Sequence, residues 1–275
     1  MKNKTNKQYY LIIVIILIIF ISISILIPTI KKDSIKLIQL SAQGPRQMMG
    51  YILKTKNDKL IIIDGGTVDD TENLMKYIKK NNYKVDYWFI THAHDDHAGF
   101  LNELLGRNKD FKVIMSNKAM EILKRGQICF EGGCSTFPAW VFCKFMRMLG
   151  KEKHLFPAIE DKYDDRFIKI TEANKTVLED LLQGKILYTP GHTSDSISLR
   201  IDNIIFCGDA TMNAFKSMKR RSIWIENKEE FGKSWDVLFS EDVDWIYPAH
   251  GKPFPKSDIK KFQKEISKMK IYNIT

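Results

Sequence analysis

Apolar positions along the chain show two kinds of spacing, short runs typical of strands and repeats typical of helices. In the first half the runs predict strands at 35–40, 51–55, 60–63 and 85–90, with a hairpin turn at Asn57-Asp58. Leu74, Met75 and Ile78 repeat at helical spacing and predict a helix over about 70–81. Strands and helices therefore alternate from the start of this region.

The second half continues the same mixture. We predict a helix over 117–125, a closing helix over 256–270, and strands around 113 and at 186–189, 196–201, 204–207 and 243–247. No internal repeat of fixed period is visible. Because strands and helices are intermixed throughout, the pattern indicates one layered α/β domain.

The stretch 126–184 is less regular and holds an apolar cluster. Its members are Phe137, Trp140, Val141, Phe142, Phe145, Met146 and Met148. Two interpretations stay open at this stage: a helix packed on the core, or a lid or pocket wall over an active site.

Residues 9–27 form an apolar run of 19 residues that is interrupted only by Ser22 and Ser24. At about 1.5 Å per helical residue it spans roughly the 30 Å core of a bilayer. A cleaved signal peptide and a buried helix are alternatives, but the run is long, has no small-residue cleavage pattern and has no polar face. We predict a retained single-pass anchor within residues 1–30 and a catalytic domain over 31–275, at the cell membrane and outside the cell.

The charge and the cysteines add little to this picture. The net charge of +10 falls to +7 without Lys2, Lys4 and Lys7, and the excess is spread along the chain. It suits an anionic substrate, membrane or wall polymer, or it reflects a lysine-rich proteome; no nucleic-acid module is visible. The cysteines have no zinc-finger spacing, so Cys129–Cys134 and Cys134–Cys143 pairings both stay open, while Cys207 is predicted to be a buried thiol.

Five of the six histidines stand in three short segments, each of which follows a predicted strand. The segment His92-x-His94-x-Asp96-His97 places four candidate ligands within six residues, where we expect a loop rather than a helix. Imidazole nitrogens and carboxylate oxygens suit zinc at about 2.0–2.2 Å. With His192, Asp209 and His250 the set reaches seven, which is too many for one tetrahedral ion, so two ions that share a carboxylate are predicted.

Five ordered segments resemble the metallo-β-lactamase superfamily and span about 35–255. They are Ile63-Asp64-Gly65-Gly66, Thr91-His92-Ala93-His94-Asp95-Asp96-His97, Pro190-Gly191-His192-Thr193, Cys207-Gly208-Asp209-Ala210 and Pro248-Ala249-His250-Gly251. The resemblance implies an αββα sandwich with two ions at one edge of the facing sheets, here preceded by the predicted transmembrane helix. It implies zinc, with iron or manganese as alternatives.

The resemblance also assigns roles to residues. His92, His94 and His192 hold the first ion, Asp96, His97 and His250 hold the second, and Asp209 bridges them. Asp64 orients the ligand loop, and Asp96 is the catalytic candidate that steers the nucleophile or moves its proton. Asp95 matches no ligand position and is expected to face solvent, and His154 is expected to be an ordinary surface histidine.

The implied chemistry is hydrolysis by metal-bound hydroxide. With Asp209 and the Pro190-Gly191-His192-Thr193 turn, the pattern is similar to glyoxalase-II-like and lactonase-like enzymes, so an ester, thioester or lactone substrate is expected. Alternatives are a phosphodiesterase that acts on wall or lipid head groups, and a mononuclear iron sulfur dioxygenase. Because 25 residues follow His250, we expect specificity from the loops at 43–49 and around Trp140.

Overall fold

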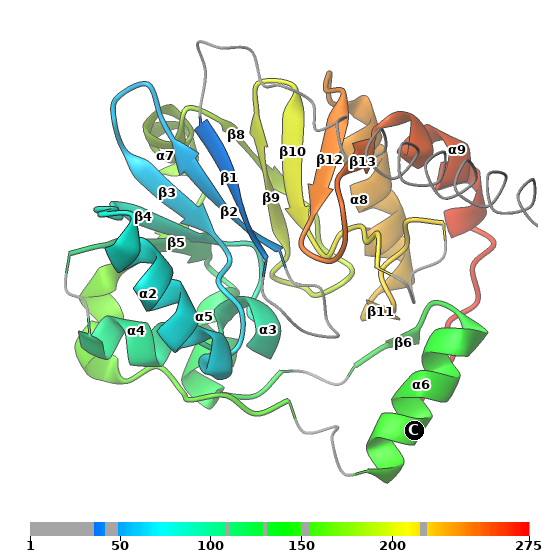
Figure 1. The fold of residues 1–275 in the computed structure, drawn as a ribbon. Helices are drawn as coiled ribbons and strands as arrows, with labels where there is room; N and C mark the ends of the chain where they lie inside the picture. Colours follow the sequence, from blue (N-terminus) through cyan, green and yellow to red (C-terminus); the bar gives the residue numbers. More distant parts are fainter. Residues whose placement is uncertain are drawn as a thin grey trace, which may run out of the picture. The chain divides into compact units, whose positions relative to one another are not determined.

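Two mixed β-sheets lie at the centre of the fold (Figure 1). The computed structural model describes residues 36–41, 49–107, 110–128, 131–149, 154–214 and 219–274. All of these residues belong to one compact unit, 35–275.

The larger sheet has six strands in the order β1-β2-β3-β4-β5-β7. The first three strands run antiparallel, and β3, β4, β5 and β7 run parallel. Their bounds are β1 (Lys36–Ser41), β2 (Met49–Lys54), β3 (Leu60–Ile63), β4 (Tyr87–Ile90), β5 (Lys112–Ser116) and β7 (Phe167–Ile170). All four residues of β3 are buried, as expected for a strand that is covered on both faces.

The second sheet has five strands in the order β13-β12-β10-β9-β8, with β10 and β12 parallel. The bounds are β8 (Lys185–Tyr188), β9 (Ile197–Ile201), β10 (Ile204–Gly208), β12 (Trp245–Pro248) and β13 (Phe254–Pro255). A separate two-stranded ribbon pairs β6 (Gly133–Cys134) with β11 (Trp224–Ile225).

Helices cover the outer face of each sheet. Buried residues of α2 (Thr71–Lys80), α4 (Leu101–Arg107) and α5 (Ala119–Arg125) pack with β2–β5 in one core. Those of α8 (Lys228–Ser240) and α9 (Ser257–Ile266) pack with β10 and β12 in another. The remaining helices are η1 (Val68–Asp70), α3 (Asp95–Ala98), α6 (Phe137–Met148), η2 (Asp161–Arg166) and α7 (Lys175–Leu182). The layers confirm the predicted sandwich of two sheets between helices.

The inner faces of the two sheets meet around buried aromatic rings. Tyr51 of β2 lies with its ring 5.0 Å from that of Phe206 and 5.5 Å from that of Tyr247. Its hydroxyl donates to the carbonyl of Pro248 at 2.7 Å. Because Pro248 precedes a predicted ligand loop, this bond ties the first sheet to the part of the second that carries His250.

The predicted elements occur with shifts of a few residues at their ends, and several others were missed. The longest of the missed elements are α8, α7 and β7. The apolar cluster at 137–148 forms α6, in which only Ala139 is buried, so the interpretation as a helix packed on the core was wrong.

The predicted anchor at 9–27 and most of the predicted pocket wall at 43–49 lie outside the described residues. Within the described part of the chain, no helix combines the length and the apolar character that a membrane span needs.

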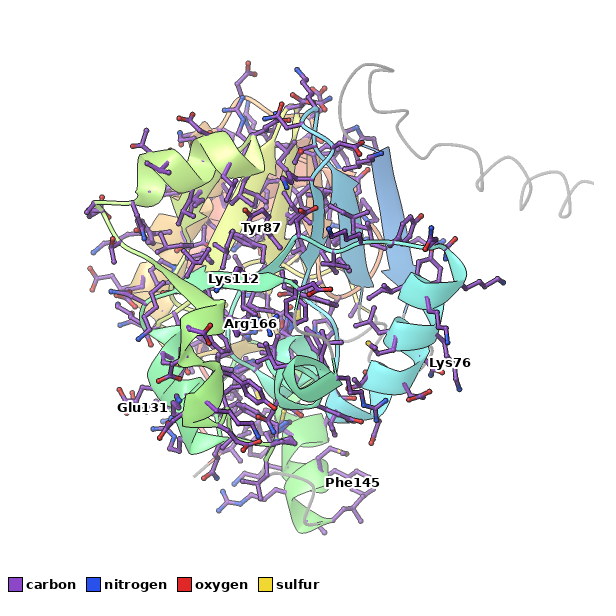
Figure 2. All side chains as sticks on the ribbon, turned by 90° about the vertical axis from the view of Figure 1, so that its left-hand side faces the viewer. Lys76, Tyr87, Lys112, Glu131, Phe145 and Arg166 are labelled. Carbon is purple, nitrogen blue, oxygen red and sulfur yellow. The ribbon has the colours of Figure 1, made fainter. Side chains whose placement is uncertain are left out.

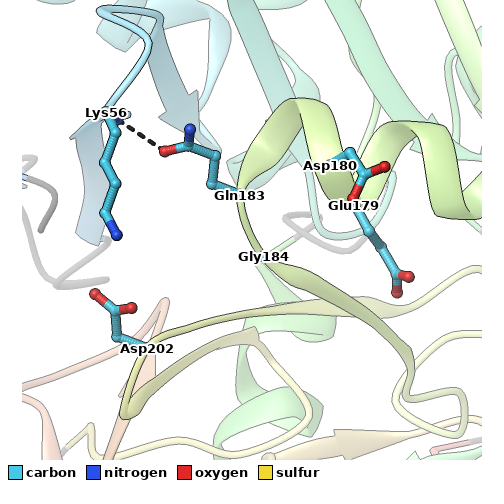
Figure 3. A pocket seen from close by; sticks show the side chains of 6 residues that line it. All are labelled: Lys56, Glu179, Asp180, Gln183, Gly184 and Asp202. Carbon is cyan, nitrogen blue, oxygen red and sulfur yellow. Dashed lines mark hydrogen bonds between the residues drawn. The ribbon is translucent and has the colours of Figure 1, made fainter.

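A polar pocket opens at the ends of the strands that lie away from the predicted ligand loops (Figure 3). Asp202 precedes β10 and Gly184 precedes β8, whereas Asp209 and His192 follow these strands. The backbone N–H of Lys56 donates to Gln183 Oε1 at 2.7 Å across this end and joins the β2–β3 turn to the end of α7.

Candidate metal centre

The histidine-rich segment begins directly after β4. His92 and His94 lie in the extended turn, and α3 then begins at Asp95, so Asp96 and His97 are helical. The expectation of a loop without helix was therefore wrong. Acidic residues in the first turn of a helix are favoured by the partial positive charge at its N-terminus, and Asp95 and Asp96 occupy that turn.

The ligand candidates from distant segments converge at one end of the sandwich. His92, His94 and His192 form one group whose ring centroids lie 4.6–4.8 Å apart. A second group joins Asp96, His97 and His250, and a third joins His92, His97 and Asp209. All seven residues predicted from the sequence are thus brought together.

Asp209 lies between the two halves of the cluster. Its carboxylate oxygens are 3.5 Å from the Nε2 atoms of His97, His192 and His250. Asp96 approaches His250 Nε2 to 3.4 Å. One carboxylate therefore faces both groups of imidazoles.

Several buried polar atoms of this cluster have no hydrogen-bond partner in the protein. They are the Nε2 atoms of His92, His94 and His97 and the Oδ1 atom of Asp209. An unpaired buried polar atom costs free energy, so four of them around one point are a poor arrangement for a protein without a ligand. Nitrogen and carboxylate donors in this arrangement fit divalent metal ions.

The opposite nitrogen of three imidazoles is held by the protein. His97 Nδ1 donates to Asp64 Oδ2 at 2.9 Å, and His192 Nδ1 donates to the carbonyl of Trp224 at 2.8 Å. Thr91 Oγ1 lies 3.1 Å from His92 Nδ1. A neutral histidine that donates from Nδ1 carries its lone pair on Nε2, which here points into the cluster. Fixing the ring in this way is the usual role of the residues that hydrogen-bond to a metal-binding histidine.

Asp64 supports the ligand loop through several bonds. Besides His97, its carboxylate accepts from the backbone N–H and the hydroxyl of Thr91 at 2.9 and 2.8 Å. The residue is buried and has a φ of 53°, a conformation that Asp and Asn tolerate better than most residues. These contacts place Asp64 beside the ligand loop, where the family resemblance expects a residue that orients it.

Glycines precede two of the ligands because the backbone needs space there. A side chain at Gly208 would bring a Cβ within 2.4 Å of Thr91 Oγ1, and one at Gly191 would come within 2.2 Å of the backbone nitrogen of Phe231. Both also have positive φ, at 52° and 119°. Close packing of these turns sets the positions of Asp209 and His192.

Asp195 was missed from the sequence. Its buried carboxylate accepts from the backbone N–H of Ala93 at 2.9 Å, and Ala93 stands between His92 and His94. Burial raises the pKa of this carboxyl. The contact joins the loop of His192 to the histidine-rich segment.

We expect Asp195→Ala to lower the free energy of unfolding by about 1–3 kcal/mol, because the buried N–H of Ala93 loses its acceptor. Chemical denaturation of the two proteins measures the change. The neighbouring Ser194→Ala, at an exposed position, is the matched control and should unfold like the parent. Equal losses in both variants would contradict the role given to Asp195.

Asp95 does not face solvent as predicted. Its side chain is 14% exposed, and its Oδ1 lies 3.1 Å from His154 Nδ1. His154, expected to be an ordinary surface histidine, is only partly exposed and contacts the metal-binding segment through this pair. The two residues are 59 positions apart, so spacing carried no signal of their contact.

Electrostatics divide the histidines into two classes. Burial lowers the pKa of His92, His94 and His192, to about 3 for His94. Burial also acts to lower the pKa of His250, but Asp209 and Asp96 outweigh it and raise this pKa to about 9. The pKa of His97 is raised in the same way by Asp209 and Asp64, while His250 and His97 outweigh burial and hold the pKa of Asp209 at about 2.

This division predicts proton release when the metal-free protein takes up metal. In the metal-free protein the raised pKa favours the protonated form of His97 and His250, and the lowered pKa favours the neutral form of His92, His94 and His192. Because ions bind neutral imidazole, loading the site of Asp96, His97 and His250 should release protons from these two histidines, whereas the imidazoles of the other site have none to release. Affinity at the releasing site should therefore rise with pH up to about 9.

Zinc titration calorimetry in buffers of different ionisation enthalpy measures these protons. The heat of one binding step should change with the buffer much more than that of the other. Heats that are the same in every buffer would contradict the assignment.

Comparisons with known proteins agree with this geometry. A family model described as the metallo-beta-lactamase superfamily matches residues 44–250. A probable metallo-hydrolase of Methanocaldococcus jannaschii is 27% identical over 222 residues, which cover 78% of this chain and 93% of the relative. A hydroxyacylglutathione hydrolase of Buchnera aphidicola subsp. Schizaphis graminum is 25% identical over 164 residues, 58% of this chain. This match covers 45% of that relative's length. The match to a metallo-beta-lactamase fold-containing protein of Sulfurisphaera tokodaii also covers 45% of the relative, so this chain spans less than half the length of these two proteins.

Solved structures show the same fold. An archaeal metallo-beta-lactamase superfamily protein from Sulfolobus tokodaii aligns with a TM-score of 0.56 at 20% identity and covers 84% of this chain and 85% of its own. A protein crystallised in a di-iron-bound form aligns with a TM-score of 0.58 at 18% identity and covers 82% and 97%. At these identities the likeness concerns the fold alone.

Proposed function

We propose that this chain, which belongs to the metallo-β-lactamase superfamily, is a metallo-hydrolase that cleaves an ester, thioester or lactone bond with two zinc ions. One observation carries the proposal. Buried imidazole nitrogens and carboxylate oxygens from four loops converge, and several have no partner within the protein. Such a set suits two cations better than any internal hydrogen-bond network.

The seven residues divide between two ions. His92, His94 and His192 would hold the first, Asp96, His97 and His250 the second, and Asp209 would contact both. When bound, such ions supply two kinds of chemistry: they activate water near neutral pH, and they polarise the carbonyl or phosphoryl oxygen of the substrate.

Exposure indicates the side from which substrate enters. His97 and His92 are almost completely buried, while the Asp96 side chain is 16% exposed and His94 and His250 are slightly exposed. Substrate therefore approaches past Asp96. From this edge the Asp96 carboxylate can accept a hydrogen bond from the attacking water and move its proton.

Metal identity is testable by elemental analysis of protein purified without chelators. Zinc with hydrolysis supports the proposal, whereas a single iron with oxygen consumption supports the sulfur dioxygenase alternative. Iron is included because one structural neighbour was crystallised in a di-iron-bound form, and manganese because its ligand preference includes carboxylates.

The substrate class is inferred from a relative and from charge. The similarity to a hydroxyacylglutathione hydrolase favours a thioester or a related acyl bond. A net charge of +10 favours the second candidate, a phosphodiesterase that acts on anionic wall or lipid head groups. Assays of the full chain on a model lactone, a thioester and bis-nitrophenyl phosphate separate them, and turnover of none would contradict both.

We also propose that residues 9–27 form a single-pass membrane anchor and that the catalytic domain lies outside the cell. The substrate is then a small molecule or a compound derived from lipid or cell wall. No nucleic-acid partner is proposed. Digestion of intact cells by added protease tests this topology, because only an external domain is cleaved.

A further inference from the structure

The helix α6 carries an apolar stripe that faces solvent. Phe145 is 54% exposed and Met148 82% exposed, and the neighbouring stripe residues are exposed as well: Phe137, Val141 and Leu149. The helix protrudes from the sandwich in Figure 1, and Figure 2 shows Phe145 on it. Monomeric proteins rarely expose contiguous apolar surface of this kind without a binding role.

Residues along one edge of the stripe, together with Ala139 on the opposite side, fix α6 to the protein, so the stripe cannot easily turn inward. Trp140 Nε1 donates to the carbonyl of Asn273 at 2.8 Å, and Lys144 and Arg147 both donate to the carbonyl of Ile274. Ala139 is buried beneath the helix. Thr136 caps the N-terminus by accepting from the N–H of Ala139 at 3.2 Å.

The residues beside the stripe have the composition of a helix that lies in a membrane interface. Trp140, Lys144 and Arg147 follow one another at spacings of four and three, so they form a row along one edge of the stripe. An apolar face edged by basic and indole side chains matches interfacial helices, in which the cations meet anionic head groups.

The predicted anchor would keep the catalytic domain near a bilayer. Residues 28–35 separate the apolar run from β1, and eight extended residues reach at most roughly 30 Å. A domain on so short a tether stays beside the bilayer in which its anchor lies. Of the possible occupants, an anionic lipid surface therefore fits the stripe and its basic edge better than a second protein.

We propose that α6 lies on the surface of an anionic phospholipid bilayer, with Phe137, Val141, Phe145, Met148 and Leu149 among the acyl chains and Lys144 and Arg147 at the head groups. The proposal gives α6 a lipid-facing surface where the sequence left open a lid or pocket wall.

The position of α6 links this surface to the metal centre. β6 lies just before the helix and pairs with β11, and the carbonyl of Trp224 in β11 accepts from His192 Nδ1. Seating α6 on the bilayer therefore brings the His192 side of the centre close to the lipid. As a consequence that rests on the proposed hydrolase function, the substrate is an amphiphile taken from the membrane.

Photocrosslinking tests the surface without any need for activity. The full chain carries benzoylphenylalanine in place of Phe145 and is reconstituted in vesicles of phosphatidylcholine and phosphatidylglycerol. The control carries it in place of Lys76, which is exposed on α2 (Figure 2). We expect a lipid adduct at position 145 several-fold above that at position 76, with a lower yield in vesicles of phosphatidylcholine alone.

Two results would overturn the proposal. One is a crosslinked dimer at position 145 in place of a lipid adduct, which assigns the stripe to a second copy of the chain. The other is a lipid adduct no stronger at 145 than at 76.

The variant Phe145→Glu with Met148→Glu tests the consequence for substrate. Hydrolysis of an ester embedded in vesicles should fall several-fold, while hydrolysis of a soluble ester and the melting temperature stay unchanged. Equal rates on the vesicle ester would overturn the link between surface and substrate. Inactivity of the parent on every ester, with the lipid adduct retained, would instead overturn the hydrolase proposal alone.

Discussion

The double variant His94→Ala with Asp96→Ala is expected to lose hydrolytic activity by about 10²–10⁴-fold or more, because it removes one ligand from each half of the centre and the proposed proton acceptor. His94 belongs to the group with His92 and His192, and Asp96 to the group with His97 and His250. With Asp209, three of the four proposed donors remain at each position, so metal binding should weaken at both. Initial rates on whichever model substrate the parent hydrolyses measure the loss, together with metal content.

Asp180→Ala is the matched control for this experiment. Asp180 is an exposed acidic residue on α7, beside the pocket at the far end of the strands. Its removal changes charge without touching the centre, so activity and metal content should equal those of the parent. Full activity in the double variant, with the fold intact, would rule out the proposed mechanism.

The ligand loops could be located from the sequence because each follows a buried strand. The apolar residues of β4 lead directly to Thr91 and His92, and those of β10 lead to Asp209. Asp and Gly are depleted in strands, so a change from a buried apolar run to Asp, His or Gly marks the end of a strand. This change is visible without a structure. The order of the strands in the two sheets then brings these loops together, and that order was known only from the family resemblance.

The supporting contacts could not be predicted in the same way. Asp195 contacts Ala93 across 102 positions and His154 contacts Asp95 across 59, so no local pattern encodes either pair. α8 is a different case, because Phe231, Trp235 and Leu238 are buried at the spacing of one helix face. That signal was present in the sequence and was missed.

The exposure of the α6 residues could not be predicted from the sequence either. A stripe of Phe, Val and Met at helical spacing is what a core helix requires, and the composition alone favours burial. In the structure the polar atoms at the edge of the stripe, such as Trp140 Nε1 and Lys144 Nζ, bond to the C-terminal segment at Asn273 and Ile274. Those bonds select which face of α6 points outward.

Asp64→Ala is expected to combine a loss of stability with a loss of metal. The change removes the acceptor for His97 Nδ1 and for both donors of Thr91, all of which are buried. Breaking a buried pair of this kind costs about 3–5 kcal/mol. Loss of a group that orients a ligand weakens metal affinity about 10–100-fold. Denaturation of the metal-free protein measures the first effect, and competition with a chelator measures the second.

Asp64→Asn separates the two effects, because asparagine keeps the size of the side chain and tolerates the φ of 53°. Its amide has one acceptor and one donor end, whereas the carboxylate accepts from His97 with Oδ2 and from the Thr91 N–H with Oδ1. Either orientation therefore sets an amide N–H against another N–H donor. We expect metal affinity to fall nearly as far as in Asp64→Ala, with a smaller loss of stability. An asparagine variant that binds metal like the parent would show that a carboxylate is not what orients His97.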